Sequence, residues 1–181
     1  MVALSTAVQV QEALQRGVAQ RGGRPPLLLD YARLLLEHGP LRFFAGLAEG
    51  ALLEFMLRRF ELARERVQQP FSLRIDDGPA DPRGGGPSCS VVEILVDDRP
   101  FLIDSIQSFL VSQDTHIQAL LHPILTVRRD AQGGLLAVAD TAQGEGVHEA
   151  HICLMVDPVP PRLRQALLEE LRAVLFDVIR C

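Results

Sequence analysis

Residues 90–113 read SVVEILVDDRPFLIDSIQSFLVSQ, and the predicted fold depends mainly on this stretch. Five of the six residues at 91–96 are apolar, which is typical of a strand that is covered on at least one face. After the polar turn at 97–100, apolar side chains recur at helical spacing at Leu102, Ile106, Phe109 and Leu110. The stretch therefore predicts a strand, a short turn and an amphipathic helix from about Pro100 to Gln113.

A second strand-like run, IQALLHPILTVRR, follows at residues 117–129. Pro123 lies inside it, and proline cannot donate a hydrogen bond to a strand ladder. We therefore expect one long strand over residues 117–128 that lies at a sheet edge or carries a bulge. An exposed edge there would favour pairing with a second copy of the chain.

Turn-forming residues separate this run from the remaining elements. Residues 130–134, DAQGG, predict a turn that folds 135–139 back on 124–128. The apolar run at 150–156 predicts another buried strand. The segment that opens at Pro160-Pro161 has one apolar face, which predicts a final helix.

Upstream of residue 90, a strand and a loop are expected. Residues 71–75 alternate apolar and polar side chains with period two, and we expect this half-buried strand to pair antiparallel with 91–96. Residues 76–89 are rich in glycine, proline and aspartate, which predicts a surface loop. The loop contains Gly84-Gly85-Gly86, but a dinucleotide fingerprint needs its glycines after a strand, and these precede one.

The first 69 residues are expected to be helical. Ser5 is a candidate N-cap of a first helix, which the glycines at 22–23 interrupt. A second helix is expected from Pro25-Pro26 to Gly39-Pro40, and a third from Leu41 to about Gln68. In the third helix we place Arg58, Arg59, Glu61, Arg64 and Glu65 away from the apolar stripe.

These elements define the expected domain organisation. Residues 1–69 form a helical N-terminal region, and residues 70–181 form an α+β domain that includes the loop at 76–89. The predicted order of that domain places two helices over a single face of a mainly antiparallel sheet.

The composition excludes several functional classes. The net charge is −5 and all 18 cationic residues are arginines spread along the chain, so no surface for nucleic acid is expected. The apolar runs are far shorter than the ~20 residues that cross a bilayer, and no secretory pattern follows Met1. Three cysteines at irregular spacing do not make a disulfide framework. We expect a soluble cytoplasmic protein without a membrane partner.

The run VDDRPFLI at residues 96–103, followed by a helix and a strand, resembles the ACT domain, a ferredoxin-like module that senses amino acids. A wider set of residues is similar to the N-terminal region of the large bacterial NAD-specific glutamate dehydrogenases. The set comprises 92–94, 97–106, His122-Pro123-Ile124-Leu125, 128–130 and His151. The resemblance covers about residues 40–180 and implies an ACT-type β-α-β-β-α sandwich after the N-terminal helices.

In that family the whole enzyme oxidatively deaminates L-glutamate to 2-oxoglutarate with NAD, using a separate downstream domain. These 181 residues contain no lysine, on which glutamate dehydrogenases rely to activate substrate, and no Gly-x-Gly-x-x-Gly after a strand. We therefore expect no catalytic residue and no cofactor in this chain, with NAD bound elsewhere in the full-length enzyme. The resemblance implies a regulatory or assembly domain, whose partners are the remainder of the polypeptide and further copies in a homo-oligomer.

The alternative is a free-standing sensor of the ACT type with an amino acid as its effector. Many ACT domains place glycine after the proline of the strand-to-helix turn, where an amino acid approaches the helix N-terminus. Phe101 stands at that position, and its ring has the bulk to fill the approach. The resemblance assigns a ligand site to Asp98, Arg99, Pro100, Phe101 and His122.

Two constellations with metal-binding residue types have simpler explanations. Donor types that zinc accepts occur at His148, His151 and Cys153, with Cys89 as a candidate fourth ligand, but a strand can carry such residues without a metal. Asp97 and Asp98 carry carboxylates that suit a cation, yet a helix N-terminus favours carboxylates by itself. We expect no metal site.

Overall fold

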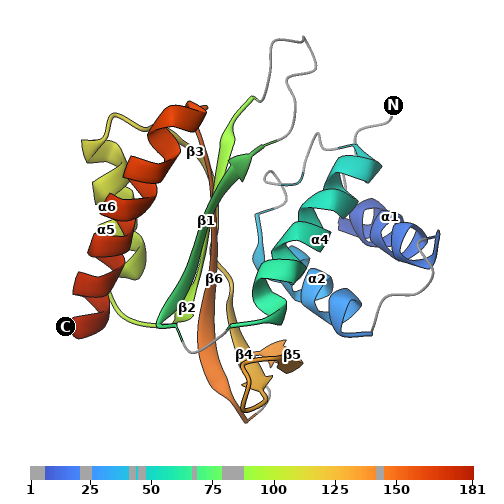
Figure 1. The fold of residues 1–181 in the computed structure, drawn as a ribbon. Coiled ribbons are helices and arrows are strands. Elements are labelled where there is room, and N and C mark those ends of the chain that lie inside the picture. Colours follow the sequence, from blue (N-terminus) through green and yellow to red (C-terminus); the bar gives the residue numbers. More distant parts are fainter. Residues whose placement is uncertain are drawn as a thin grey trace.

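In the computed structural model, the described residues are 7–20, 26–40, 44, 48–66, 69–78, 88–141 and 145–181. Their elements in chain order are α1 (Ala7–Gln20), α2 (Pro26–His38), α4 (Glu49–Arg64), β1 (Phe71–Asp77), β2 (Ser90–Asp97), α5 (Leu102–Ser112), β3 (Ile117–Leu121), β4 (Ile124–Arg129), β5 (Leu135–Asp140), β6 (Val147–Val156) and α6 (Pro161–Arg180). A six-stranded sheet forms the middle layer, with α5 and α6 on one face and α1, α2 and α4 on the other (Figure 1).

All strand pairs of the sheet are antiparallel. The strand order is β1-β2-β6-β4-β5, and β3 also pairs with β6. β1 pairs with β2 along its whole length, so the predicted antiparallel partner of residues 91–96 is confirmed. The predicted turn before β5 is confirmed as well, because β5 folds back on β4 with Val138 opposite Val127. The α+β fold class expected from the sequence is therefore correct.

The single long strand predicted over residues 117–128 is wrong, and its second half does not lie at a sheet edge, because β4 pairs with both β5 and β6. The structure divides this run into β3 and β4, and Pro123 lies in the break between them. β6 continues past the break and pairs first with one strand and then with the other. At the break, the backbone N–H of His151 donates to the carbonyl oxygen of Pro123 at 2.9 Å. Proline has no N–H and cannot donate a hydrogen bond to β6, so the ladder is interrupted there.

Side-chain alternation along the strands divides the interior into two cores. Val92 and Ile94 of β2 lie in the core that α5 and α6 cover, together with Ile106 of α5 and Leu171 of α6. Val91 lies in the other core, beneath α1, α2 and α4. Because the sheet is covered on both faces, its central strands are apolar at nearly every position.

The third N-terminal helix is shorter than the predicted range of 41–68. α4 spans Glu49–Arg64, and the residue after it, Glu65, has an extended backbone. The next residue leaves the helix because its backbone N–H bonds elsewhere: Arg66 donates to the carbonyl oxygen of Gly133 at 3.1 Å. A contact with the β4–β5 turn therefore ends this helix.

Several predicted features lie outside the described residues. These are the Ser5 N-cap, the break at 22–23, and the glycines at 84–86. Among the described residues, no helix has the length and apolar character needed to cross a membrane. The domain boundary at residue 69 stays a prediction.

Candidate functional site

The residues that the sequence assigned to a ligand site lie at one end of the sheet, where β2 turns into α5. Asp98, Arg99 and Pro100 are exposed in this turn. Phe101 has a left-handed backbone, with φ of 67°, and its side chain is 74% exposed. Its ring therefore projects largely into solvent, and its backbone adopts a conformation that favours glycine.

His122 comes from the break between β3 and β4 and is half-buried. Burial lowers its pKa below the usual value, while the negative charge of Asp98 acts in the opposite direction. The two side chains are thus close enough to interact electrostatically. The Nε2 atom of His122 is buried and has no hydrogen-bond partner among the described residues. Whether this turn binds a ligand stays a prediction.

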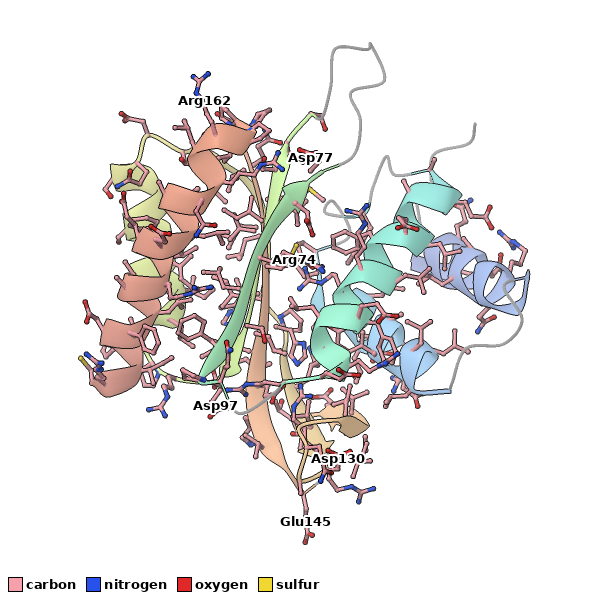
Figure 2. The ribbon with its side chains drawn as sticks, viewed as in Figure 1. Arg74, Asp77, Asp97, Asp130, Glu145 and Arg162 are labelled. Carbon is pink, nitrogen blue, oxygen red and sulfur yellow. The ribbon has the colours of Figure 1, made fainter. Side chains whose placement is uncertain are left out.

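A second polar region was not predicted: an ion-pair network between the helical layer and the sheet. We call it the interlayer network, and it consists of Tyr31, Arg59, Arg66, Arg74, Glu93, Arg129, Glu149 and His151. Most of these side chains are buried, and they come from α2, from α4 and the segment after it, and from strands β1, β2, β4 and β6. Arg74, for example, lies on the side of the sheet that faces α4 (Figure 2).

Glu93 is the acceptor at the centre of one half of the network. It lies in β2, is 3% exposed, and accepts a hydrogen bond from Arg59 Nη1 at 3.0 Å. Arg74 Nε donates to its second carboxylate oxygen at 2.9 Å. The prediction that Arg59 lies on the polar face of its helix is wrong, because this side chain is also 3% exposed. It points into the core, where the Glu93 carboxylate compensates its charge.

Glu149 is the acceptor at the centre of the other half. Arg129 binds it with two parallel hydrogen bonds of 2.8 Å each, and Arg66 Nη1 donates to it at 2.9 Å. Arg66 also donates to Asp97 at 2.5 Å, and Arg129 donates to the carbonyl oxygen of Ala63 at 3.0 Å. Because Ala63 lies in α4, these arginines attach the end of that helix to the sheet.

Tyr31 and His151 complete the network beneath α2. The Tyr31 hydroxyl lies 3.0 Å from His151 Nδ1, and both residues are 1% exposed. Burial, together with the positive charges of Arg59, Arg129 and Arg66, places the pKa of His151 well below its usual value. The imidazole is therefore neutral, and its Nε2 atom, 3.6 Å from Glu149, makes a close contact without an ion pair.

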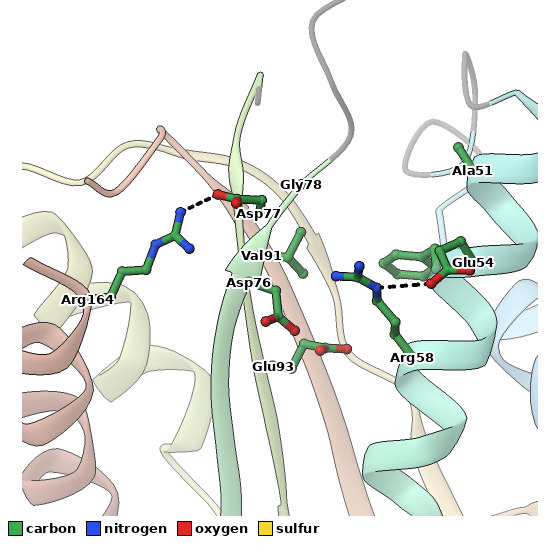
Figure 3. A pocket seen from close by; sticks show the side chains of 10 residues that line it. Ala51, Glu54, Arg58, Asp76, Asp77, Gly78, Val91, Glu93 and Arg164 are labelled. Atoms are coloured by element: carbon green, nitrogen blue, oxygen red, sulfur yellow. Dashed lines mark hydrogen bonds and ion pairs between the residues drawn. The ribbon is translucent and has the colours of Figure 1, made fainter. Parts of the chain in front are cut away.

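A pocket of about 350 Å³ opens beside the network, between α4 and the ends of β1 and β2 (Figure 3). Its apolar lining is Ala51, Phe55 and Val91, and its charged lining is Glu54, Arg58, Asp76, Asp77, Glu93 and Arg164. Its volume lies in the range of small-molecule sites, and a mixed lining of this kind can orient a ligand by its polar groups. No local pattern in the sequence signals this pocket, because α4 is distant in the chain from the strands that it meets.

The three candidate zinc ligands of β6, which are His148, His151 and Cys153, do not all lie on the same side of the strand. His148 lies 3.1 Å from the hydroxyl of Thr126, whereas His151 and Cys153 face the helical layer. The described residues contain no group of three potential metal ligands. Cys89 and Cys153 are buried free thiols, and burial raises the pKa of each.

An antiparallel sheet with two helices packed on one face is the fold of an ACT-like domain, and this defines the structural class of the chain. Comparison with protein families is more specific: the family described as glutamate dehydrogenase, ACT1 domain, matches residues 31–175. The chain belongs to this family. No curated protein and no solved structure matches it.

Proposed function

We propose that this chain is a non-catalytic N-terminal domain that serves regulation or assembly in an NAD-dependent glutamate dehydrogenase. The observation that carries the proposal is the family match, which includes α4 and the sheet together. The interlayer network supports it, because it joins the N-terminal helices to the sheet through buried ion pairs. A rigid unit of this kind can present fixed surfaces to the rest of a larger enzyme.

The whole enzyme, in this proposal, oxidatively deaminates L-glutamate to 2-oxoglutarate. The reaction and the binding of NAD belong to the remainder of the polypeptide. The chain offers arginine as its only strongly basic side chain, and arginine stays charged where a substrate-activating lysine must lose a proton. The enzyme acts in the cytoplasm as a homo-oligomer.

The test compares the 181-residue chain with the complete polypeptide that contains it. We expect NADH formation from L-glutamate by the complete polypeptide and none by the isolated chain. Removal of residues 1–181 from the complete polypeptide should change its sedimentation coefficient beyond the lost mass, or its response to amino acids. Turnover of glutamate by the isolated chain would contradict the proposal. So would a truncated enzyme with unchanged assembly, kinetics and regulation.

The second candidate function is a free-standing sensor of the ACT type. The pocket between α4 and the sheet favours it, since a ligand site within the chain would need no other domain. The mass of the protein isolated from its natural source separates the candidates. A mass near 19.9 kDa supports the sensor, and a polypeptide many times larger supports the dehydrogenase domain.

A further inference from the structure

The two end strands of the sheet differ in how their outer edges are protected. β1 and β5 each have a neighbour on one side only among the described strands. β1 carries Arg74, Asp76 and Asp77, and charged side chains on an end strand hinder pairing with another chain. β5 has no charged residue before Asp140 and no proline, and its Leu136 is 54% exposed. β5 therefore keeps an edge that can accept a further strand.

A hollow of about 330 Å³ lies beside this edge. Ala137, Val138 and Ala139 of β5 line it, together with Thr126 and Arg128 of β4. The core beneath α5 and α6 contains no described residue of β4 or β5, so these helices leave this face of the two strands uncovered. The small alanine side chains leave room for a long side chain on β4 to reach across β5.

Arg128 is the available cation of the hollow. It is exposed, and it has no hydrogen-bond or ion-pair partner among the residues that the structure describes. It lies opposite Ala137, so a strand added to β5 would be two strand spacings away. That distance is about 10 Å, which an arginine and a facing glutamate span together. A guanidinium with free terminal nitrogens binds a carboxylate through two parallel hydrogen bonds.

Glu145 lines the same hollow from the other side of β4. It precedes Val147 of β6, which pairs with Val127 of β4, and Figure 2 shows it at the end of the sheet where β6 begins. It also has no partner in the described part of the chain. Its charge opposes the approach of an acidic side chain, so Arg128 and Glu145 should affect an acidic partner in opposite directions.

A second copy of the chain does not supply the missing carboxylate. Asp140 is the only charged residue of β5, and it lies opposite Leu125, whose side chain faces the core beneath the N-terminal helices. Asp140 is therefore on the face of β5 opposite to the hollow. Antiparallel pairing of β5 with β5 of another copy would place no acidic side chain of that strand next to Arg128.

We propose that the edge of β5 binds an extended acidic segment from the remainder of the glutamate dehydrogenase polypeptide, with a carboxylate of that segment on Arg128. The inference rests on the proposed function in regulation or assembly and adds the surface through which the domain acts. Main-chain hydrogen bonds to β5 supply affinity, and Arg128 supplies the preference for an acidic side chain. A short strand suffices, because a segment of the same polypeptide has a high effective concentration.

Amide hydrogen exchange compares the edge of β5 in the complete polypeptide and in the 181-residue chain. We expect the amides of residues 136–140 to exchange at least about tenfold more slowly in the complete polypeptide. Arg128→Gln in the complete polypeptide should lose most of this protection. Arg172→Gln, at an exposed arginine of α6, is the matched control and should keep it. Equal exchange in the two proteins, or full protection in Arg128→Gln, overturns the proposal.

Peptides test the chemistry of the partner. The probe is the acetylated and amidated hexapeptide Ser-Val-Glu-Val-Ser-Val, and two controls carry glutamine or lysine in place of glutamate. In NMR titrations of the isotope-labelled 181-residue chain, the glutamate peptide should shift the amides of 136–140 and bind at least about tenfold more tightly than the lysine peptide. Arg128→Gln should remove this preference, and Glu145→Gln should strengthen binding of the glutamate peptide. Equal binding of the three peptides, or weaker binding by Glu145→Gln, overturns the proposal.

Failure of this inference is distinguishable from failure of the proposed function. If Arg128→Gln exposes β5 in the complete polypeptide but changes neither its kinetics nor its assembly, the edge is a binding surface and the proposed function is wrong. If β5 exchanges equally in both proteins but removal of residues 1–181 alters assembly, the domain acts through another surface. Protection that appears in the isolated chain and grows with its concentration would assign the edge to a second copy and overturn the inference.

Discussion

At the scale of single residues, buried charges of the interlayer network determine how the sheet meets the N-terminal helices. Glu93 and Arg59 are each 3% exposed, and neither has solvent to compensate its charge. A buried ion pair adds little net stability compared with an apolar pair of the same shape, but removal of one partner is costly. Such a pair therefore acts mainly on specificity, since it disfavours any packing of α4 that separates the two charges.

Glu93→Gln should be strongly destabilising for this reason. The substitution leaves the guanidinium of Arg59 buried without its carboxylate, and we expect the free energy of unfolding in urea to fall by about 3 kcal/mol. Glu54→Gln, at an exposed glutamate of the same layer, is the control and should cost less than about 1 kcal/mol. The double variant Glu93→Gln, Arg59→Gln should recover part of the loss. A double variant less stable than Glu93→Gln would contradict the pairing.

His151 should make the stability depend on pH. Its pKa is well below the usual value in the folded protein, so between about pH 6.5 and pH 5 the unfolded chain binds a proton that the folded chain does not. Stability is therefore complete above about pH 7 and falls as the pH decreases, by up to about 1.4 kcal/mol per pH unit. His122 contributes in the same direction.

Urea unfolding at several pH values measures this effect. His151→Gln keeps a polar partner for Tyr31 and removes the titrating imidazole, so the slope between pH 5 and pH 6.5 should become shallower. His116→Gln, at an exposed histidine, is the matched control. An unchanged slope in His151→Gln would show that the imidazole is already protonated in the folded protein.

At the scale of elements, the connection between β2 and α5 contains Phe101, which together with Asp114 is one of the described non-glycine residues with a positive φ. Phe101 precedes α5 with a left-handed backbone, and Ser105 N–H donates to its carbonyl oxygen at 3.0 Å. The helix thus begins at a residue whose side chain disfavours the required conformation. A left-handed backbone costs a non-glycine residue roughly 1–2 kcal/mol.

Phe101→Gly should therefore be more stable than Phe101→Ala. Glycine removes the strain at φ of 67° but adds conformational freedom to the unfolded chain, whereas alanine keeps the strain. The largely exposed ring contributes little burial, so we expect the glycine variant to exceed the alanine variant by about 1 kcal/mol. Thermal unfolding of both variants measures the difference. Equal stabilities would indicate that the turn relaxes out of the left-handed region.

At the scale of the whole molecule, the N-terminal helices and the sheet share one core. Tyr31 of α2 and Phe60 of α4 lie in the same cluster as Val91 and Cys153 of the sheet. The interlayer network also joins the N-terminal helices to the sheet. These contacts favour cooperative unfolding of the two regions, which the sequence predicted as separate units with a boundary at residue 69.

Tyr31 offers a direct measurement of this cooperativity. It is the only tyrosine of a chain without tryptophan, and it is buried at the boundary between the layers. We expect its fluorescence and the far-UV circular dichroism to report the same urea midpoint. A fluorescence transition at lower urea would indicate that the helical region separates from a sheet that remains folded.

The order of elements after residue 70 was predictable because each has a local pattern. The apolar run of β2, the turn before β5 and the paired prolines at the start of α6 mark their elements in the sequence. The family was predictable from the same region, and the comparison confirms it. The break at Pro123 was partly predictable. The sequence shows that proline lacks an N–H, but it does not show that β6 pairs with both β3 and β4.

The fold class was therefore predictable from local patterns, because hydrophobic periodicity and turn residues act over a few neighbouring positions. The positions of the buried charges and of the pocket depend instead on how the layers pack. Arg59 looks like one of several surface arginines of α4 until the sheet places Glu93 opposite it. Arg58 and Asp76 likewise share a pocket only after the layers pack. Long-range pairing of charges depends on which faces meet, and no local pattern records that.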